Sequence, residues 1–133
     1  MFKRLFDFFS KGDVAALQGQ REGLLDLLVL GMFIDHHVAN AEGTFIQEQA
    51  RRFEWDGADT MERFIDQSTG RARDVMGSEG ATTAYLKEIA QLLSTSEAKT
   101  QALQIFEELL TVDGQLAPRE EELLTKARVH LVL

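Results

Sequence analysis

The chain has 133 residues, a length typical of one domain. It contains no cysteine, which excludes disulfides, thiolate zinc sites and cysteine nucleophiles. Its 22 acidic and 14 basic residues give a net charge of −8. The basic residues are scattered, whereas a protein that binds nucleic acid needs a concentrated basic face. We therefore expect no nucleic-acid partner.

The hydropathy pattern argues against a membrane-spanning or secreted protein. The apolar stretch at 24–34 contains Asp26 and is too short to cross a bilayer. Residues 1–7 carry charges where a signal peptide would have its apolar core, and they lack a small-residue cleavage site. We expect a cytoplasmic protein.

A single proline and a strong three-to-four-residue periodicity predict an all-helical fold, a compact bundle of about seven helices forming one domain over 1–133. Gly31, in the middle of the second helix, predicts close packing of another helix. A break or kink is expected at 68–70. In chain order we expect an amphipathic helix within 1–12 and a glycine-containing, partly helical connector at 11–23. Further helices are expected at 24–42, 45–54, 59–77, 81–93, from Ser94 or Ser96 to 113, and from Pro118 to 131.

A short turn occurs twice in the chain. EGTF at 42–45 is repeated as DGQL at 113–116, 71 positions later, and each copy lies between two apolar stretches. Glycine after an acidic residue is typical of a helix end that needs a positive φ. The pattern predicts an internal duplication of a helix–turn–helix unit, with a first repeat at 24–54 and a second at 97–131, each with an acidic corner.

The second corner is a candidate cation site. Asp113 ends one helix, where carbonyl groups lack partners, and Glu120 lies in the first turn of the next. Together with Glu121 or Glu108 and turn carbonyls, they could form the oxygen shell that Ca²⁺ or Mg²⁺ prefers. About half of the ligands of an EF-hand loop are missing. The same residues also fit helix capping without metal, so both interpretations stay open.

Other sites are less favoured. His36 and His37 are adjacent on a helix and point about 100° apart, and no Glu-x-x-His or His-Glu-x-x-His motif is present. His130 in the last predicted turn fits a partner for the helix dipole. The glycine-rich nucleotide-binding motifs and the Gly-x-Ser-x-Gly motif are also missing. We therefore expect a non-enzymatic protein.

The N-terminal segment is aromatic and amphipathic. Its apolar stripe has the i, i+3, i+4, i+7 spacing of a helix face and consists of Phe2, Leu5, Phe6 and Phe9. Three basic residues lie within 3–11 of an otherwise acidic protein. The stripe either docks on the protein's own core or makes a weak, reversible contact with a membrane or a partner.

The second corner, VDGQLAPREE at 112–121, resembles the signature of TerB-like tellurite-resistance domains. In that family the signature occurs twice, at a similar separation, in an all-helical domain with the predicted number of helices. The first corner departs from it: Glu42 replaces Asp, Gln49 replaces Glu with Glu48 one position early, and Ile46, like Ala117 in the second corner, replaces a hydroxyl residue.

The resemblance implies a cytoplasmic, non-enzymatic accessory or scaffold protein of a stress response. It further implies divalent-metal binding by the acidic residues Asp113, Glu120, Glu121, Glu42 and Glu48, weaker at the first corner. Partners would include proteins, among them membrane-protein complexes and calcium-binding proteins. The alternatives are an interaction or oligomerisation module whose corners are purely structural, and, less favoured, an enzyme.

Overall fold

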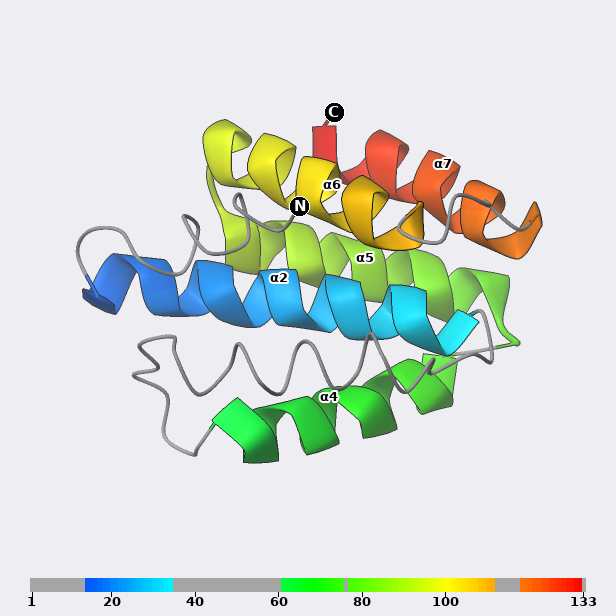
Figure 1. The fold of residues 1–133 in the computed structure, drawn as a ribbon, viewed down its shortest axis with the longest axis horizontal. Helices are drawn as coiled ribbons and strands as arrows, with labels where there is room; N and C mark the ends of the chain where they lie inside the picture. Colours follow the sequence, from blue (N-terminus) through cyan, green and yellow to red (C-terminus); the bar gives the residue numbers. More distant parts are fainter. Residues whose placement is uncertain (1–13, 35–60, 76, 112–117, 133) are drawn as a thin grey trace.

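The computed structural model describes residues 14–34, 61–75, 77–111 and 118–132. These ranges contain helices and no strand, and they form a compact bundle (Figure 1). The helices are α2 (Val14–Ile34), α4 (Met61–Val75), α5 (Glu79–Leu93), α6 (Ser96–Leu110) and α7 (Pro118–Val132). The prediction of an all-helical bundle is confirmed. The helices predicted within 1–12 and at 45–54, and the part of the second helix beyond 34, lie outside the described residues.

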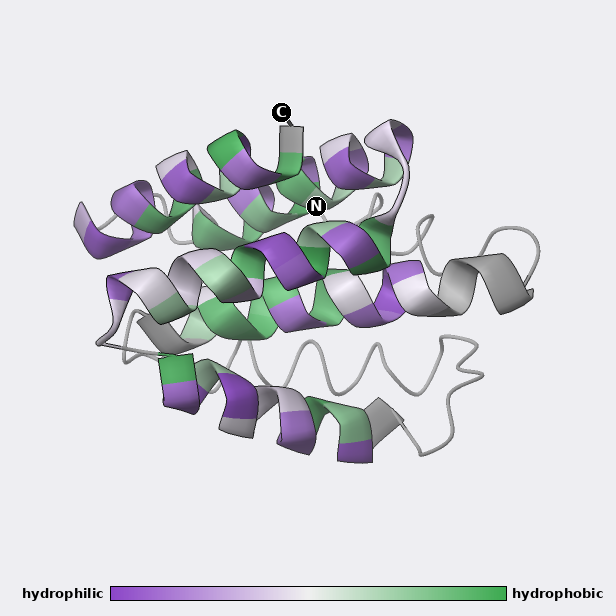
Figure 2. Ribbon diagram, turned by 180° about the vertical axis from the view of Figure 1, so that it is seen from behind, coloured by the Kyte–Doolittle hydropathy of each residue, from purple (hydrophilic) through white to green (hydrophobic). Residues whose placement is uncertain are grey.

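The central element is α2, which packs against each of the other four described helices. Its residues from Leu24 to Leu30 are almost all buried, and Figure 2 shows hydrophobic colour concentrated on α2 and α5. A helix that is apolar on nearly all sides belongs in the middle of a bundle. None of the described helices combines the length and the apolar character needed to cross a membrane.

The start of α2 differs from the prediction. The helix begins at Val14, so most of the connector predicted at 11–23 is helical. Of the three glycines in the predicted connector, Gly19 and Gly23 lie where α2 meets α5. A Cβ atom on Gly23 would lie 3.0 Å from Cβ of Leu92, and one on Gly19 would lie 3.6 Å from the Leu92 carbonyl oxygen. These glycines therefore permit close helix packing rather than a turn.

Gly31 has the packing role that the sequence predicts. A Cβ atom there would lie 2.5 Å from Cε1 of Phe106, which is completely buried on α6. The ring of Phe106 occupies the space that a side chain at position 31 would need. This contact sets how closely α2 approaches α6.

Local hydrogen bonds explain the other helix boundaries. Ser78 and Thr95 cap α5 and α6, since their side-chain oxygens accept hydrogen bonds from the backbone N–H groups of Ala81 and Ala98. The N-cap of α6 is therefore Thr95, which lies between the two serines from which the sequence predicted this helix to start. α4 continues through the predicted break at 68–70, and the Thr69 hydroxyl donates to the Ile65 carbonyl within the helix, at 2.8 Å.

Candidate functional site

The predicted cation site is described only in part. Glu120 is the third residue of α7 and is 5% exposed, whereas Glu121 beside it is exposed. Asp113, Glu42 and Glu48 lie outside the described residues. Within the described ranges, no group of three or more His, Asp or Glu side chains is arranged to hold a metal ion. The cation site and the equivalence of the two corners therefore remain predictions.

Of the other residues that the sequence singled out, one is described by the structure and the rest lie outside the described residues. His130 lies partly buried in the last turn of α7, where its predicted role is to partner the helix dipole. The remaining candidates lie outside the described residues: His36, His37, Phe2, Leu5, Phe6 and Phe9.

The structure shows a polar pocket that the sequence did not predict, formed by α2, α4 and α5. We call it the α2–α4–α5 pocket; its volume is about 250 Å³. It is lined by Glu22, Asp26, Phe64, Arg71, Tyr85, Glu88, Ile89 and Leu92. Three carboxylates and one guanidinium therefore surround a space with apolar and aromatic walls.

An ion pair forms the centre of this pocket. Nη2 of Arg71, on α4, donates to Oδ1 of Asp26, on α2, at 2.7 Å. The guanidinium also lies over the ring of Phe64, 5.1 Å from its centroid. Burial alone would lower the pKa of Arg71, but the hydrogen bond and charge of Asp26, helped by Tyr85, raise it overall. The pair lets α2 carry a carboxylate in the middle of its apolar surface.

Tyr85 contributes a buried hydroxyl next to the ion pair. The residue is 5% exposed, and burial together with the charge of Asp26 raises its pKa to about 12, although Arg71 and Ser68 act in the opposite direction. Arg71 and Ser68 lie close enough to act on the Tyr85 hydroxyl, but within the described residues neither this hydroxyl nor that of fully buried Ser68 has a partner in good hydrogen-bond geometry. A buried polar group without a partner costs about 1–3 kcal/mol. Tyr85 therefore stays neutral at physiological pH and can offer or accept one more hydrogen bond.

The carboxyl of Glu22 is partly buried in the pocket and lies near a second carboxylate, that of Asp26. Its pKa is raised by burial and by the charge of Asp26, and the guanidinium of Arg71 opposes this shift only in part. Because a raised carboxyl pKa means that the ionised form is disfavoured, additional positive charge would be favourable here.

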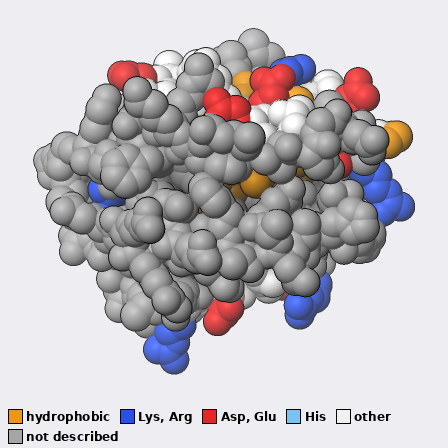
Figure 3. Space-filling view, viewed as in Figure 1, with side chains coloured by type: hydrophobic (Ala, Val, Ile, Leu, Met, Phe, Trp, Pro, Cys, Tyr) orange, Lys and Arg blue, Asp and Glu red, His pale blue; other side chains and the backbone are white. Residues whose placement is uncertain are grey.

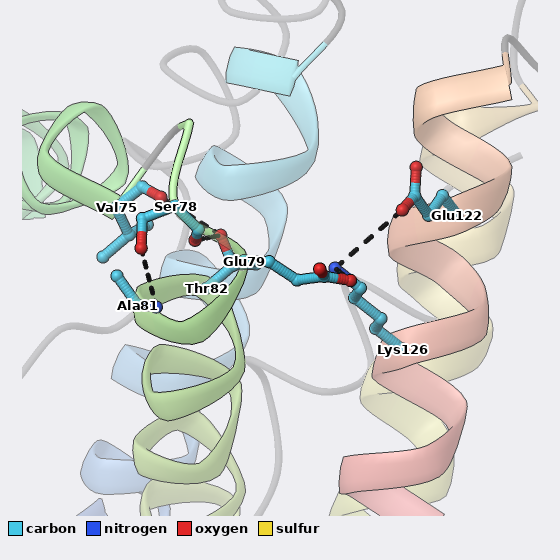
Figure 4. A network of polar contacts seen from close by, with 7 residues as sticks. All are labelled: Val75, Ser78, Glu79, Ala81, Thr82, Glu122 and Lys126. Atoms are coloured by element: carbon cyan, nitrogen blue, oxygen red, sulfur yellow. Dashed lines mark hydrogen bonds and ion pairs between the residues drawn. The ribbon is translucent and has the colours of Figure 1, made fainter.

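A second polar cluster joins α5 to α7 (Figure 4). Nζ of Lys126 lies 2.9 Å from Oε1 of Glu79 on α5 and 4.0 Å from Oε1 of Glu122, one turn earlier on α7. The pKa of Glu79 is lowered, chiefly by its hydrogen bond to Lys126. The adjoining cavity of about 310 Å³ also reaches Arg119. Acidic and basic groups balance in this cluster, which indicates a structural link between the helices.

The α2–α4–α5 pocket was missed because its residues come from three helices. One signal was present: Asp26 is an acidic residue in an otherwise apolar run, and such a residue is rarely buried without a partner. The partner, Arg71, is 45 positions away and could not be chosen from the sequence. Comparisons with protein-family models, with curated proteins and with solved structures find no match to this chain.

Proposed function

We propose that this chain is a non-enzymatic, TerB-like accessory or scaffold module whose second acidic corner binds a divalent cation, Ca²⁺ or Mg²⁺. The observation that carries the proposal is the burial of Glu120. This residue is 5% exposed in the first turn of α7, whose first residue is Pro118. The helix dipole favours a negative group at this position.

Burial distinguishes Glu120 from an ordinary capping acid. Glu121, in the same turn, is exposed, as expected of a residue that serves only the dipole. A buried glutamate is normally paired, and Glu120 does interact with another group of the protein. A hard cation shared with Asp113 would provide positive charge next to the Glu120 carboxylate and would use the oxygen ligands that Ca²⁺ and Mg²⁺ prefer. The cation would add to the interaction that Glu120 already makes within the protein, and the titration described next tests for this added partner.

The rest of the proposal follows the TerB resemblance. The fold would have seven helices with a duplicated hairpin, and the first corner, at Glu42 and Glu48, would bind a cation more weakly. The protein would be cytoplasmic, with protein partners that include membrane complexes. The Phe2, Leu5, Phe6 and Phe9 stripe would supply a weak membrane contact. The acidic composition and the helical bundle of the described ranges support this proposal at the level of fold class.

Titration calorimetry with Ca²⁺, Mg²⁺ and Mn²⁺ tests the cation site. We expect saturable binding by the wild-type chain, and a loss of affinity of about tenfold or more in Asp113→Asn and in Glu120→Gln, since each removes a charged ligand. Glu97→Gln is the matched control, because Glu97 is an exposed acid in the first turn of α6; it should bind as the wild type does.

Two results would reject the cation site: no binding heat for the wild type, or equal affinity in Asp113→Asn. The corners would then be structural caps, and the alternative of a purely structural interaction or oligomerisation module would take the place of the cation-binding module.

A further inference from the structure

We propose that the α2–α4–α5 pocket binds an organic cation, the alkylguanidinium or alkylammonium end of a ligand, between Glu22 and Glu88 and against the side chain of Leu92. This site is separate from the proposed corner at Asp113 and Glu120 and does not depend on it. The proposal combines the charge of the pocket, its apolar wall and its buried hydroxyl.

The charge of the pocket favours a cation. Glu22, Asp26 and Glu88 face it, whereas Arg71 is its one basic lining residue and is already paired with Asp26. The C-terminal end of α5 adds to this potential, because the last carbonyls of a helix carry partial negative charge. The last turn of α5 contains no basic residue to offset it. An incoming positive group therefore meets attraction from two helices.

The apolar wall favours an organic cation. Phe64, Ile89 and Leu92 line the same space, and Leu92 is one of two large apolar side chains that are exposed in the described ranges, at 39%. A methylene chain could cover Leu92 while its charged end reaches the carboxylates, in the way that lysine and arginine stems lie along apolar surface. The volume of about 250 Å³ accommodates such a group.

The spacing of the carboxylates argues against a metal ion at this place. Within the described residues, no three acidic or histidine side chains converge closely enough to coordinate a metal. Carboxylates spread around a pocket suit a guanidinium or ammonium group, which carries several N–H donors that point in different directions.

The Tyr85 hydroxyl gives an independent indication of a ligand. Tyr85 lines the pocket and is 5% exposed. Its hydroxyl oxygen has no partner in good hydrogen-bond geometry among the described residues. The neutral phenol oxygen is an acceptor. A donor that reaches this covered oxygen beside Arg71 would give it a partner in good hydrogen-bond geometry, which neither Arg71 nor Ser68 provides.

The test is a titration of the ¹⁵N-labelled full chain with n-butylguanidinium at constant ionic strength, followed by amide chemical shifts. We expect saturable shifts confined to the segments of α2, α4 and α5 around the pocket. The neutral n-butanol and the anionic n-butyrate should give no saturable shifts there. Non-saturating shifts with n-butylguanidinium, or equal shifts with n-butanol, would overturn the proposal. A parallel titration with Mg²⁺ that gave the same saturable pattern would overturn it too.

Matched variants separate the pocket from the general acidity of the protein. In the double variant Glu22→Gln/Glu88→Gln, the affinity for n-butylguanidinium should fall by up to about fivefold, as expected for the loss of two partly exposed charges. Asp74→Asn/Glu97→Gln changes the net charge equally at exposed positions outside the pocket and should keep the wild-type affinity. Equal weakening in both double variants would contradict the proposal.

A final comparison identifies the source of the cation. The blocked tripeptide acetyl-Gly-Arg-Gly-amide is titrated beside its citrulline counterpart, which lacks the charge. Binding of the arginine peptide at least as tight as that of n-butylguanidinium would indicate an arginine side chain of a protein partner. Binding of n-butylguanidinium alone would indicate a free small molecule.

Discussion

Asp26 and Arg71 share one ion pair but differ in exposure. The side chain of Asp26 is 4% exposed, whereas that of Arg71 is 39% exposed. If Asp26 loses its charge, Arg71 can still be solvated from the pocket side. If Arg71 is removed, a carboxylate is left inside the bundle without its ionic partner. A buried charge without its partner is the costlier of these two outcomes.

We therefore expect Arg71→Met to lower the free energy of unfolding by about 3 kcal/mol. Asp26→Asn should lower it by only about 1 kcal/mol, since the asparagine oxygen can still accept from Arg71. Urea unfolding followed by circular dichroism measures both. Arg73→Met, at an exposed position on the same helix, is the control and should change stability by less than about 1 kcal/mol. Equal losses in Arg71→Met and Asp26→Asn would show that the pair is not asymmetric.

At the scale of the helices, glycines have opposite roles in α2 and α4. A Cβ atom on Gly31 of α2 would clash with the ring of Phe106, which is surrounded by a filled core. A Cβ atom on Gly70 of α4 would meet nothing within 4 Å. Alanine is favoured over glycine in a helix by about 1 kcal/mol. This gain is available at position 70, but at position 31 overpacking opposes it.

Gly31→Ala should therefore lower the free energy of unfolding by about 1–3 kcal/mol, the usual cost of overpacking a core. Gly70→Ala should raise it by about 0.5–1 kcal/mol. Both values come from the same denaturant titrations as the ion-pair variants. A stabilising Gly31→Ala would mean that α2 and α6 can move apart at little cost, which would contradict the role given to this contact.

Helix boundaries show where sequence patterns succeed and where they fail. Pro118 was predicted to open the last helix and does so as the first residue of α7, because proline's fixed φ suits that position. The predicted start of α2, at residue 24, was wrong by ten residues, since the helix begins at Val14. Glycine is compatible both with a turn and with a close helix contact, and only the position of α5 distinguishes these two uses.

For the molecule as a whole, the dominant long-range force is repulsion between like charges. The net charge is −8, and acidic side chains gather over the part of the described surface where α6 and α7 lie (Figure 3). Local pairs such as Glu107–Arg128, at 2.9 Å, offset this repulsion only slightly, because exposed ion pairs contribute little. Net charge far from zero destabilises a compact state.

We expect the protein to become more stable in salt. Raising NaCl from about 20 mM to about 500 mM should increase the free energy of unfolding by on the order of 1 kcal/mol, since screening reduces the repulsion. Thermal unfolding followed by circular dichroism at several salt concentrations measures this change. The charge-reduced variant Asp74→Asn/Glu97→Gln should gain less. A fall in stability with salt would mean that ion pairs outweigh the repulsion.

The sequence by itself determined the helical class of this protein, its central apolar helix and the packing role of Gly31. Periodicity, proline usage and capping residues act over a few positions, so they can be read along the chain. Only the tertiary structure decided that Asp26 pairs with Arg71 beside Tyr85, and that Glu120 is buried while Glu121 is exposed. These features depend on which helix faces arrive next to one another, and burial and ion pairing between distant segments arise only once the helices have packed.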